Sequence, residues 1–166
     1  MTPVKVNDSA FYLKEMNEKL VFVSTPEMHI QLAPKREHNE QKFTFIKLEK
    51  GAKTPHEYIK SKEYDKALRG YLAIKEKDSL DPAIEEWVLN RLGYAMIREK
   101  KFEDAIEIFK INVALYPYKS NPYDSLGEAY WYIKDTVNTI ANFKKALSIN
   151  PENRSSKRFL KKHKLE

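Results

Sequence analysis

The chain lacks cysteine and has only 4 glycines in 166 residues. Without cysteine there are no disulfides, no thiolate metal sites and no thiol nucleophiles. The isolated glycines form no loop of the kind that cradles phosphate groups. Apolar runs such as Leu20–Val23 are far shorter than the roughly 20 residues of a membrane-spanning helix. We therefore expect no bound cofactor and no transmembrane segment.

Charges of both signs are abundant but unevenly placed along the chain. The net charge is +6, and residues 154–166 hold six Lys and Arg against one Glu, so almost all of the excess lies in this segment. A basic segment can contact phosphates of nucleic acids or membranes. The sequence has no nucleic-acid reader motif, however, so nucleic-acid binding is disfavoured and such a contact stays a weaker hypothesis.

The strongest pattern is an internal repeat with a period of 34 residues. A Leu-Gly pair, a phenylalanine and a proline recur at this shift, as Leu92-Gly93 and Leu126-Gly127, Phe109 and Phe143, and Pro117 and Pro151. Apolar residues between these anchors follow the spacing of two amphipathic helices per period. This pattern is that of the tetratricopeptide repeat (TPR), in which helical hairpins stack into a solenoid.

We predict the helical repeat domain over 54–166, with clear repeats at 82–119 and 120–153. Asp81-Pro82 and Asn121-Pro122 are start signals, because Pro is tolerated in the first turn of a helix. A capping box at Thr54-Pro55-His56-Glu57 opens a degenerate repeat at 54–80. Residues 154–164 are predicted to form the helix that covers the last apolar face of the solenoid.

Residues 1–50 show a different pattern, with short runs rich in Phe, Val, Ile and Tyr. Alternation of apolar and polar residues, as in 28–33, is typical of strands. We predict a small meander of three or four strands from the runs 10–13, 20–24, 28–33 and 42–48. The expected fold class is mainly α, a TPR-like helical-hairpin solenoid with a small N-terminal antiparallel β segment.

The repeats also resemble a particular group of proteins. The segments 89–94, 102–106, 115–117 and 123–130 are similar to the C-terminal TPR tails of bacterial serine hydrolases of the penicillin-binding, β-lactamase-like and esterase kinds. The resemblance implies an accessory region beside a catalytic domain. The catalytic motifs of such hydrolases are absent, since no Ser precedes Lys by three residues and Lys53-Thr54 runs into Pro55.

We expect neither a catalytic nor a metal site. The four histidines are scattered, and although His56-Glu57 begins like a zinc-protease motif, Lys60 stands where the second His belongs. Asp124 and Glu128 lie four residues apart, the spacing of a carboxylate pair, but no nucleophile or base accompanies them. The chain is therefore predicted not to be an enzyme.

Binding is the remaining function, and the concave face of the solenoid is the expected site. This face is built from the first helix of each repeat. By spacing it carries Asn90, Tyr94, Ile97 and Arg98, then Asp124, Glu128, Trp131 and Tyr132. Trp131 and Tyr132 are candidate anchors for a partner, although Trp131 could instead pack against the capping helix. Because Asp124 and Glu128 are acidic, we predict a ligand with apolar and basic side chains.

The functional prediction is thus a non-enzymatic module that binds a protein or peptide segment in the concave groove. The alternative is an accessory region of a serine hydrolase whose catalytic domain is absent from this chain. The first 25 residues hold no secretory apolar stretch, so the chain as it stands is expected in the cytoplasm. If it belongs to an exported parent, the expected compartment is the periplasm.

Overall fold

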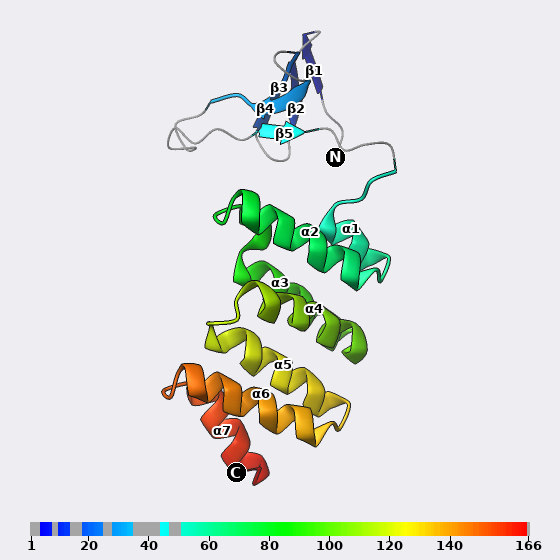
Figure 1. Ribbon diagram of the computed structural model, residues 1–166. Helices are drawn as coiled ribbons and strands as arrows, with labels where there is room; N and C mark the ends of the chain where they lie inside the picture. Colours follow the sequence, from blue (N-terminus) through cyan, green and yellow to red (C-terminus); the bar gives the residue numbers. More distant parts are fainter. Residues whose placement is uncertain are drawn as a thin grey trace. The chain divides into compact units, whose positions relative to one another are not determined.

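The computed structural model describes residues 4–7, 10–13, 18–24, 28–34, 44–46 and 51–165. The chain divides into two compact units, Met1–Ala52 and Lys53–Glu166 (Figure 1). The first unit contains strands and the second contains helices. Each unit is described on its own below.

The described part of the first unit is an antiparallel meander of five strands in sequential order. The strands are β1 Val4–Asn7, β2 Ala10–Leu13, β3 Glu18–Val23, β4 His29–Leu32 and β5 Thr44–Ile46. Strand β1 was not predicted. It lies at the sheet edge beside β2, and all of its residues are exposed. Its sequence Val-Lys-Val-Asn alternates apolar and polar residues, but over four residues only. The ends of the predicted run 42–48 fall outside the described residues.

The second unit is a stack of three antiparallel helical hairpins followed by one terminal helix (Figure 1). The hairpins are α1 Pro55–Lys60 with α2 Tyr64–Lys77, α3 Glu86–Arg98 with α4 Phe102–Leu115, and α5 Ser120–Tyr132 with α6 Thr136–Ile149. The terminal helix is α7 Arg154–His163, which packs on α6. A short 3-10 turn, η3 Pro82–Ile84, precedes α3.

The local capping signals account for several helix ends. Thr54 and Glu57 form the complete capping box at the start of α1, with Pro55 in the first turn. Asp81 caps only η3, because Glu85 adopts an extended conformation and α3 starts at Glu86. The prediction that a continuous helix opens at Pro82 was therefore wrong by one turn.

The three hairpins share one turn geometry. Lys62, Lys100 and Lys134 have positive φ angles of 60°, 59° and 63° at the same place in each turn. In each turn the N–H of the next residue bonds to the carbonyl five positions earlier, at 2.9–3.1 Å. This pattern is the Schellman motif, in which one left-handed residue reverses the chain after a helix. A lysine in this role gives little signal in a sequence, since glycine is usual there.

The core of the helical unit lies between successive hairpins. Phe109 of α4 is 0% exposed and packs with Leu126 and Ala129 of the next hairpin. Gly93 faces Phe109 closely, because a Cβ atom at position 93 would lie 2.4 Å from its Cε1 atom. Two polar residues are buried where the other repeat has alanine: Thr139 in α6, opposite Ala105 in the repeat, and Asn112 in α4, opposite Ala146. The fold accommodates both.

Candidate partner-binding surface

The surface of interest is formed by α3 and α5, the first helices of the second and third hairpins, and by α7, and we call it the first-helix face. It consists of Asn90, Tyr94 and Arg98 of α3, Asp124, Glu128, Trp131 and Tyr132 of α5, and Arg158 and Lys162 of α7. The two α7 residues follow Asp124 and Glu128 by one repeat period, so they occupy the equivalent helix positions. Sequence reasoning did not include them in the site.

Tyr94 and Glu128 are bound to each other across two helices. The Tyr94 hydroxyl donates a hydrogen bond to Oε2 of Glu128 at 2.9 Å, and the tyrosine ring packs edge-on against Phe109 at 5.3 Å. Burial is the main cause that raises the pKa of Tyr94, and the negative charge of Glu128 raises it further. The phenol therefore stays protonated and keeps its donor directed at this carboxylate.

Asp124 was predicted to face a ligand on the concave surface, but in the structure it is buried. Its residue is 7% exposed, and the Ser156 hydroxyl of α7 donates a hydrogen bond to its Oδ1 atom. Asn90 is also engaged inside the unit, because it accepts a hydrogen bond from Ser125 at 2.7 Å. The prediction of a basic ligand was based on Asp124 and Glu128. Asp124 is buried, and Glu128 is half-buried with one oxygen bound by Tyr94, so both acids are less accessible than the prediction assumed.

The two predicted aromatic anchors have different surroundings. Trp131 packs edge-on against Phe159 of α7 at 5.5 Å and lies 4.4 Å from the His163 ring. It thus takes the alternative role, contact with the capping helix. Tyr132 stacks on Phe102 at 5.0 Å and is 43% exposed, so part of its ring remains accessible.

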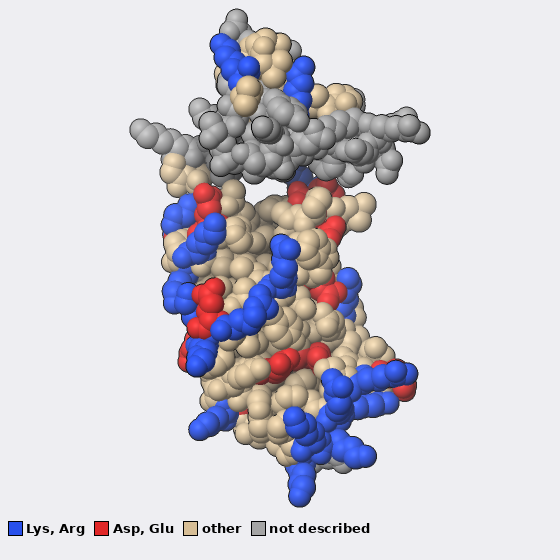
Figure 2. Space-filling view, turned by 180° about the vertical axis from the view of Figure 1, so that it is seen from behind, with Lys and Arg blue, Asp and Glu red and all other residues tan. Residues whose placement is uncertain are grey.

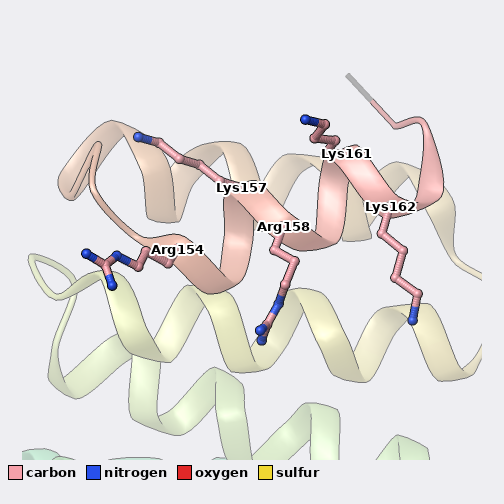
Figure 3. Close-up of a pocket in the computed structure, with 5 residues that line it drawn as sticks. All are labelled: Arg154, Lys157, Arg158, Lys161 and Lys162. Atoms are coloured by element: carbon pink, nitrogen blue, oxygen red, sulfur yellow. The ribbon is translucent and has the colours of Figure 1, made fainter.

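Cations dominate the C-terminal end of this surface. A shallow hollow of about 620 Å³ on α7 is lined by Arg154, Lys157, Arg158, Lys161 and Lys162. Arg158 and Lys162 point to the side of α7 on which α5 is drawn, while Lys157 and Lys161 point to the other side (Figure 3). Lys and Arg side chains gather over this end of the helical unit (Figure 2).

Trp87 is an exposed aromatic side chain at the start of the second hairpin. It is 55% exposed at the start of α3, and the Arg91 guanidinium lies 5.0 Å from the centre of its ring. The extended Glu85 shifts the helix start so that Trp87 falls in the first turn, beside solvent. Its position five residues before Leu92 could have indicated exposure, because Asn121 occupies the matching place in the next repeat.

The described residues form no group of three or more His, Asp or Glu that could hold a metal ion. Within the same part of the chain, no helix is long and apolar enough to cross a membrane.

Comparisons with known proteins return solved TPR domains. No family model and no curated protein matches the chain. The chain is similar to the first TPR domain of Spaghetti (RPAP3) bound to the HSP90 peptide SRMEEVD, at 22% identity over 65% of this chain and 82% of that one, with a TM-score of 0.45. It is also similar to the Sgt2 TPR domain from Aspergillus fumigatus, at 21% identity over 66% of this chain and 72% of that one, with a TM-score of 0.46.

A third similar structure is the second TPR domain of human RPAP3 in complex with the HSP70 peptide SGPTIEEVD. It shares 18% identity over 66% of this chain and 88% of that one, with a TM-score of 0.46. The predicted fold class is confirmed: the chain has a TPR-like helical-hairpin solenoid with a small antiparallel β segment. The resemblance to serine hydrolase tails stays a prediction.

Proposed function

We propose that this chain is a protein-interaction module whose first-helix face binds an acidic segment of a partner. The observation that carries the proposal is the state of the charges on this face. The carboxylates of Asp124 and Glu128 are bound to Ser156 and Tyr94 inside the helical unit. These hydroxyl donors leave both negative charges in place, but Asp124 is buried and Glu128 is half-buried, whereas Arg98, Arg158 and Lys162 on the same face are exposed. Three cations against two acids give this face a small positive excess, and the exposed charges that a partner meets are mainly positive.

Three cations carry most of this exposed positive charge. Arg98, Arg158 and Lys162 are exposed, and among the described residues none has a carboxylate within ion-pair distance. Charge-assisted hydrogen bonds to carboxylates are stronger than neutral ones. An acidic partner segment would supply those carboxylates. Of the two acids on this face, Asp124 is buried and Glu128 is half-buried and accepts the hydrogen bond of Tyr94.

The exposed part of Tyr132 adds an apolar contact between the cations of α3 and α7. Aromatic side chains supply large contact area at little loss of side-chain freedom, and for this reason they are enriched at binding hot spots. The preferred ligand is therefore an acidic segment that also carries an apolar or aromatic residue. This ligand is opposite in charge to the one expected from the sequence.

The test uses two variants of α7, each with two cations replaced by glutamate. In one variant the replaced residues lie on the first-helix face, and in the other they lie on the opposite side of the helix. The face variant combines Arg158→Glu with Lys162→Glu, and the control variant combines Lys157→Glu with Lys161→Glu. The probe is a fluorescein-labelled peptide in which Glu and Asp alternate with Leu and Tyr, and its partner probe has Lys in place of the acids. Binding is followed by fluorescence anisotropy at low salt and at about 0.15 M salt.

We expect the acidic peptide to bind the wild type. In the face variant the dissociation constant should rise about tenfold or more, because two attractive charges become repulsive and about 1.4 kcal/mol of binding free energy corresponds to a factor of ten. The control variant should change the affinity by less than about threefold, because long-range charge is screened. Equal losses in the two variants would mean general charge attraction. Tighter binding of a single-stranded oligonucleotide, with a steep salt dependence, would contradict the proposal.

A further inference from the structure

A separate cavity lies between the first and second hairpins. Its volume is about 270 Å³, and it is bounded by α1, α2, α3 and α4. Its apolar lining consists of Ile59, Leu92, Met96 and Ile108. Ligand pockets for drug-sized molecules start at roughly 300 Å³, so a cavity of this size suits a single side chain.

The next interface along the stack shows why this one is hollow. Counted from the positive-φ lysine of each turn, Tyr94 and Tyr130 occupy the positions at the second interface that His56 and Met96 hold at the first. Both tyrosine rings pack on the cluster around Phe109 and fill that interface. His and Met are smaller than Tyr, so the same backbone arrangement leaves space between the first two hairpins.

The mouth of the cavity is positively charged. Lys60, Lys62 and Lys101 line it together with a single carboxylate, Asp104. Asp104 is already bound on both oxygens, by Lys62 at 2.8 Å and by the hydroxyl of Tyr64 at 2.7 Å. Burial raises the pKa of Asp104, but these two hydrogen bonds and the charge of Lys62 outweigh it, and the net shift is downward.

Two lysines at the mouth, Lys60 and Lys101, are available to bind an anion. Lys60 is exposed, and no carboxylate of the described residues forms an ion pair with it. Lys101 pairs with Glu99 at 2.6 Å, and both side chains are about half exposed. Such a surface pair contributes little, so Lys101 can exchange Glu99 for another carboxylate at low cost.

From these observations the geometry points to an anchor pocket for one apolar side chain, of the size of Leu or Met, that has a carboxylate next to it in the partner segment. The apolar lining of the cavity would bury the side chain, and Lys60 and Lys101 would bind the carboxylate. The pocket would fix the register of the acidic segment that binds the first-helix face. In that respect the inference rests on the proposed function.

The pocket can be tested on its own with a small probe. The probe is 4-methylpentanoate, which carries the branched end of a leucine side chain and one carboxylate. Methyl resonances of Ile59, Met96 and Ile108 in the full chain are followed by carbon–proton NMR during titration. We expect saturable shifts of these methyl groups with 4-methylpentanoate, and at least tenfold weaker effects with its amide or with acetate.

The matched variant is Met96→Tyr, which copies Tyr130 of the next interface and fills the cavity. It should abolish the shifts of Ile59 and Ile108 while the thermal midpoint stays within a few degrees of the wild type. His56→Tyr is a second filling variant if the first one is unstable. Equal probe binding in the wild type and in the filled variants would overturn the pocket.

Two peptides connect the pocket with the proposed function. Both are acidic and differ only in one Leu that is replaced by Ala. In the wild type the Leu peptide should bind about tenfold more tightly, because burying such a side chain contributes more than one tenfold step, and in Met96→Tyr the ratio should fall to about one. Equal binding of both peptides to the wild type overturns the pocket and leaves the proposed function intact. Methyl shifts with 4-methylpentanoate, without binding of either peptide, overturn the proposed function alone.

Discussion

The hairpins α3–α4 and α5–α6 carry the same sequence anchors but are packed differently. A Cβ atom at Gly93 would lie 2.4 Å from Phe109, whereas a Cβ atom at Gly127 would lie 3.2 Å from Phe143. Phe109 is covered by the next hairpin, and Phe143 is covered by Phe159 of the single helix α7 at a ring distance of 4.4 Å. The same sequence motif therefore packs differently in the two hairpins. The difference comes from the next element in the chain, a full hairpin after α4 and the single helix α7 after α6.

The polar residues of the two hairpins differ in the same way. Asn112 of α4 is fully buried, donates to the Glu86 carbonyl at 3.1 Å, and among the described residues its Oδ1 atom has no hydrogen-bond partner. Ala146 is its counterpart in α6. The third hairpin has its own buried polar residue, Thr139 of α6, whose hydroxyl donates a hydrogen bond to the Asp135 carbonyl at 2.7 Å. The Thr139 hydroxyl is thus hydrogen-bonded at the start of its own helix, whereas the Asn112 amide, within the described part of the chain, bonds to another helix through its nitrogen alone.

The largest expected effect is that of Phe109→Ala. Removal of this fully buried ring should lower the free energy of unfolding by about 3–5 kcal/mol, because it leaves a cavity between two hairpins. Urea unfolding followed by circular dichroism measures the change. A loss below about 1 kcal/mol with unchanged helicity would show that the repeat register is wrong.

The covering of Phe143 by α7 is tested by Phe159→Ala. We expect a loss of about 2–3 kcal/mol, less than at Phe109, because Phe159 is only partly buried and contacts Trp131 and His163 at the end of the stack. In a Trp87→Phe background Trp131 is the only tryptophan, and its emission should shift to longer wavelength as α7 detaches. Unchanged emission would show that α7 does not cover this end.

The two glycines give a direct contrast. Gly93→Ala should cost about 1–3 kcal/mol, because the new methyl group overlaps the buried ring of Phe109. Gly127→Ala should stay within about 1 kcal/mol of the wild type, because a small shift of Phe143 relieves a 3.2 Å contact and alanine favours the helix. Thermal unfolding of the two variants side by side measures the difference. Equal losses would contradict the packing difference between the hairpins.

Asn112→Ala makes the second hairpin like the third at this position. The substitution removes one hydrogen bond and also one buried acceptor without a partner, so the two effects oppose each other. We expect a change within about 1 kcal/mol, measured by urea unfolding. Thr139→Ala is the matched control in the third hairpin. A loss above about 3 kcal/mol in Asn112→Ala would mean that the amide is fully satisfied in the folded protein.

The smallest effect concerns Asp104, whose counterpart in the third hairpin is Asn138. The folded pKa of Asp104 lies below its ordinary value of 3.8, so its contribution is present above about pH 4 and is lost as the pH falls through the folded pKa. Asp104→Asn should lower the free energy of unfolding at pH 7 by about 0.5–1 kcal/mol. The difference between wild type and variant should shrink below pH 4. A difference that is constant with pH would contradict the lowered pKa.

Much of the helical fold could be predicted because its signals are local. The 34-residue period, the small residue at Gly93 and the large one at Phe109 follow from how two helices approach each other. The positive φ at Lys62 and its equivalents could not be predicted, since lysine gives no turn signal. Strand β1 was missed because its alternation of apolar and polar residues, Val-Lys-Val-Asn, is only four residues long.

The candidate site was predicted less well than the fold. Sequence spacing placed Asn90, Tyr94, Asp124 and Glu128 on neighbouring first helices. In the structure Tyr94 bonds to Glu128, and Asn90 bonds to Ser125 beside Asp124. Spacing could not show that Ser156, 32 residues beyond Asp124, would take up that carboxylate. Nor could it show that Trp131 contacts α7 or that Trp87 is exposed.

By itself the sequence determined the repeat period, the hairpins and the amphipathic terminal helix, because helix formation and the crossing of paired helices depend on residues close in the chain. Only the tertiary structure decided which charges a partner can reach. Burial and hydrogen bonding of a side chain depend on residues 34 to 40 positions away, as with Tyr94 and Glu128 or with Asp104 and Tyr64. The same long-range packing left the cavity at the first interface, because the volume of a gap is set by both hairpins that border it.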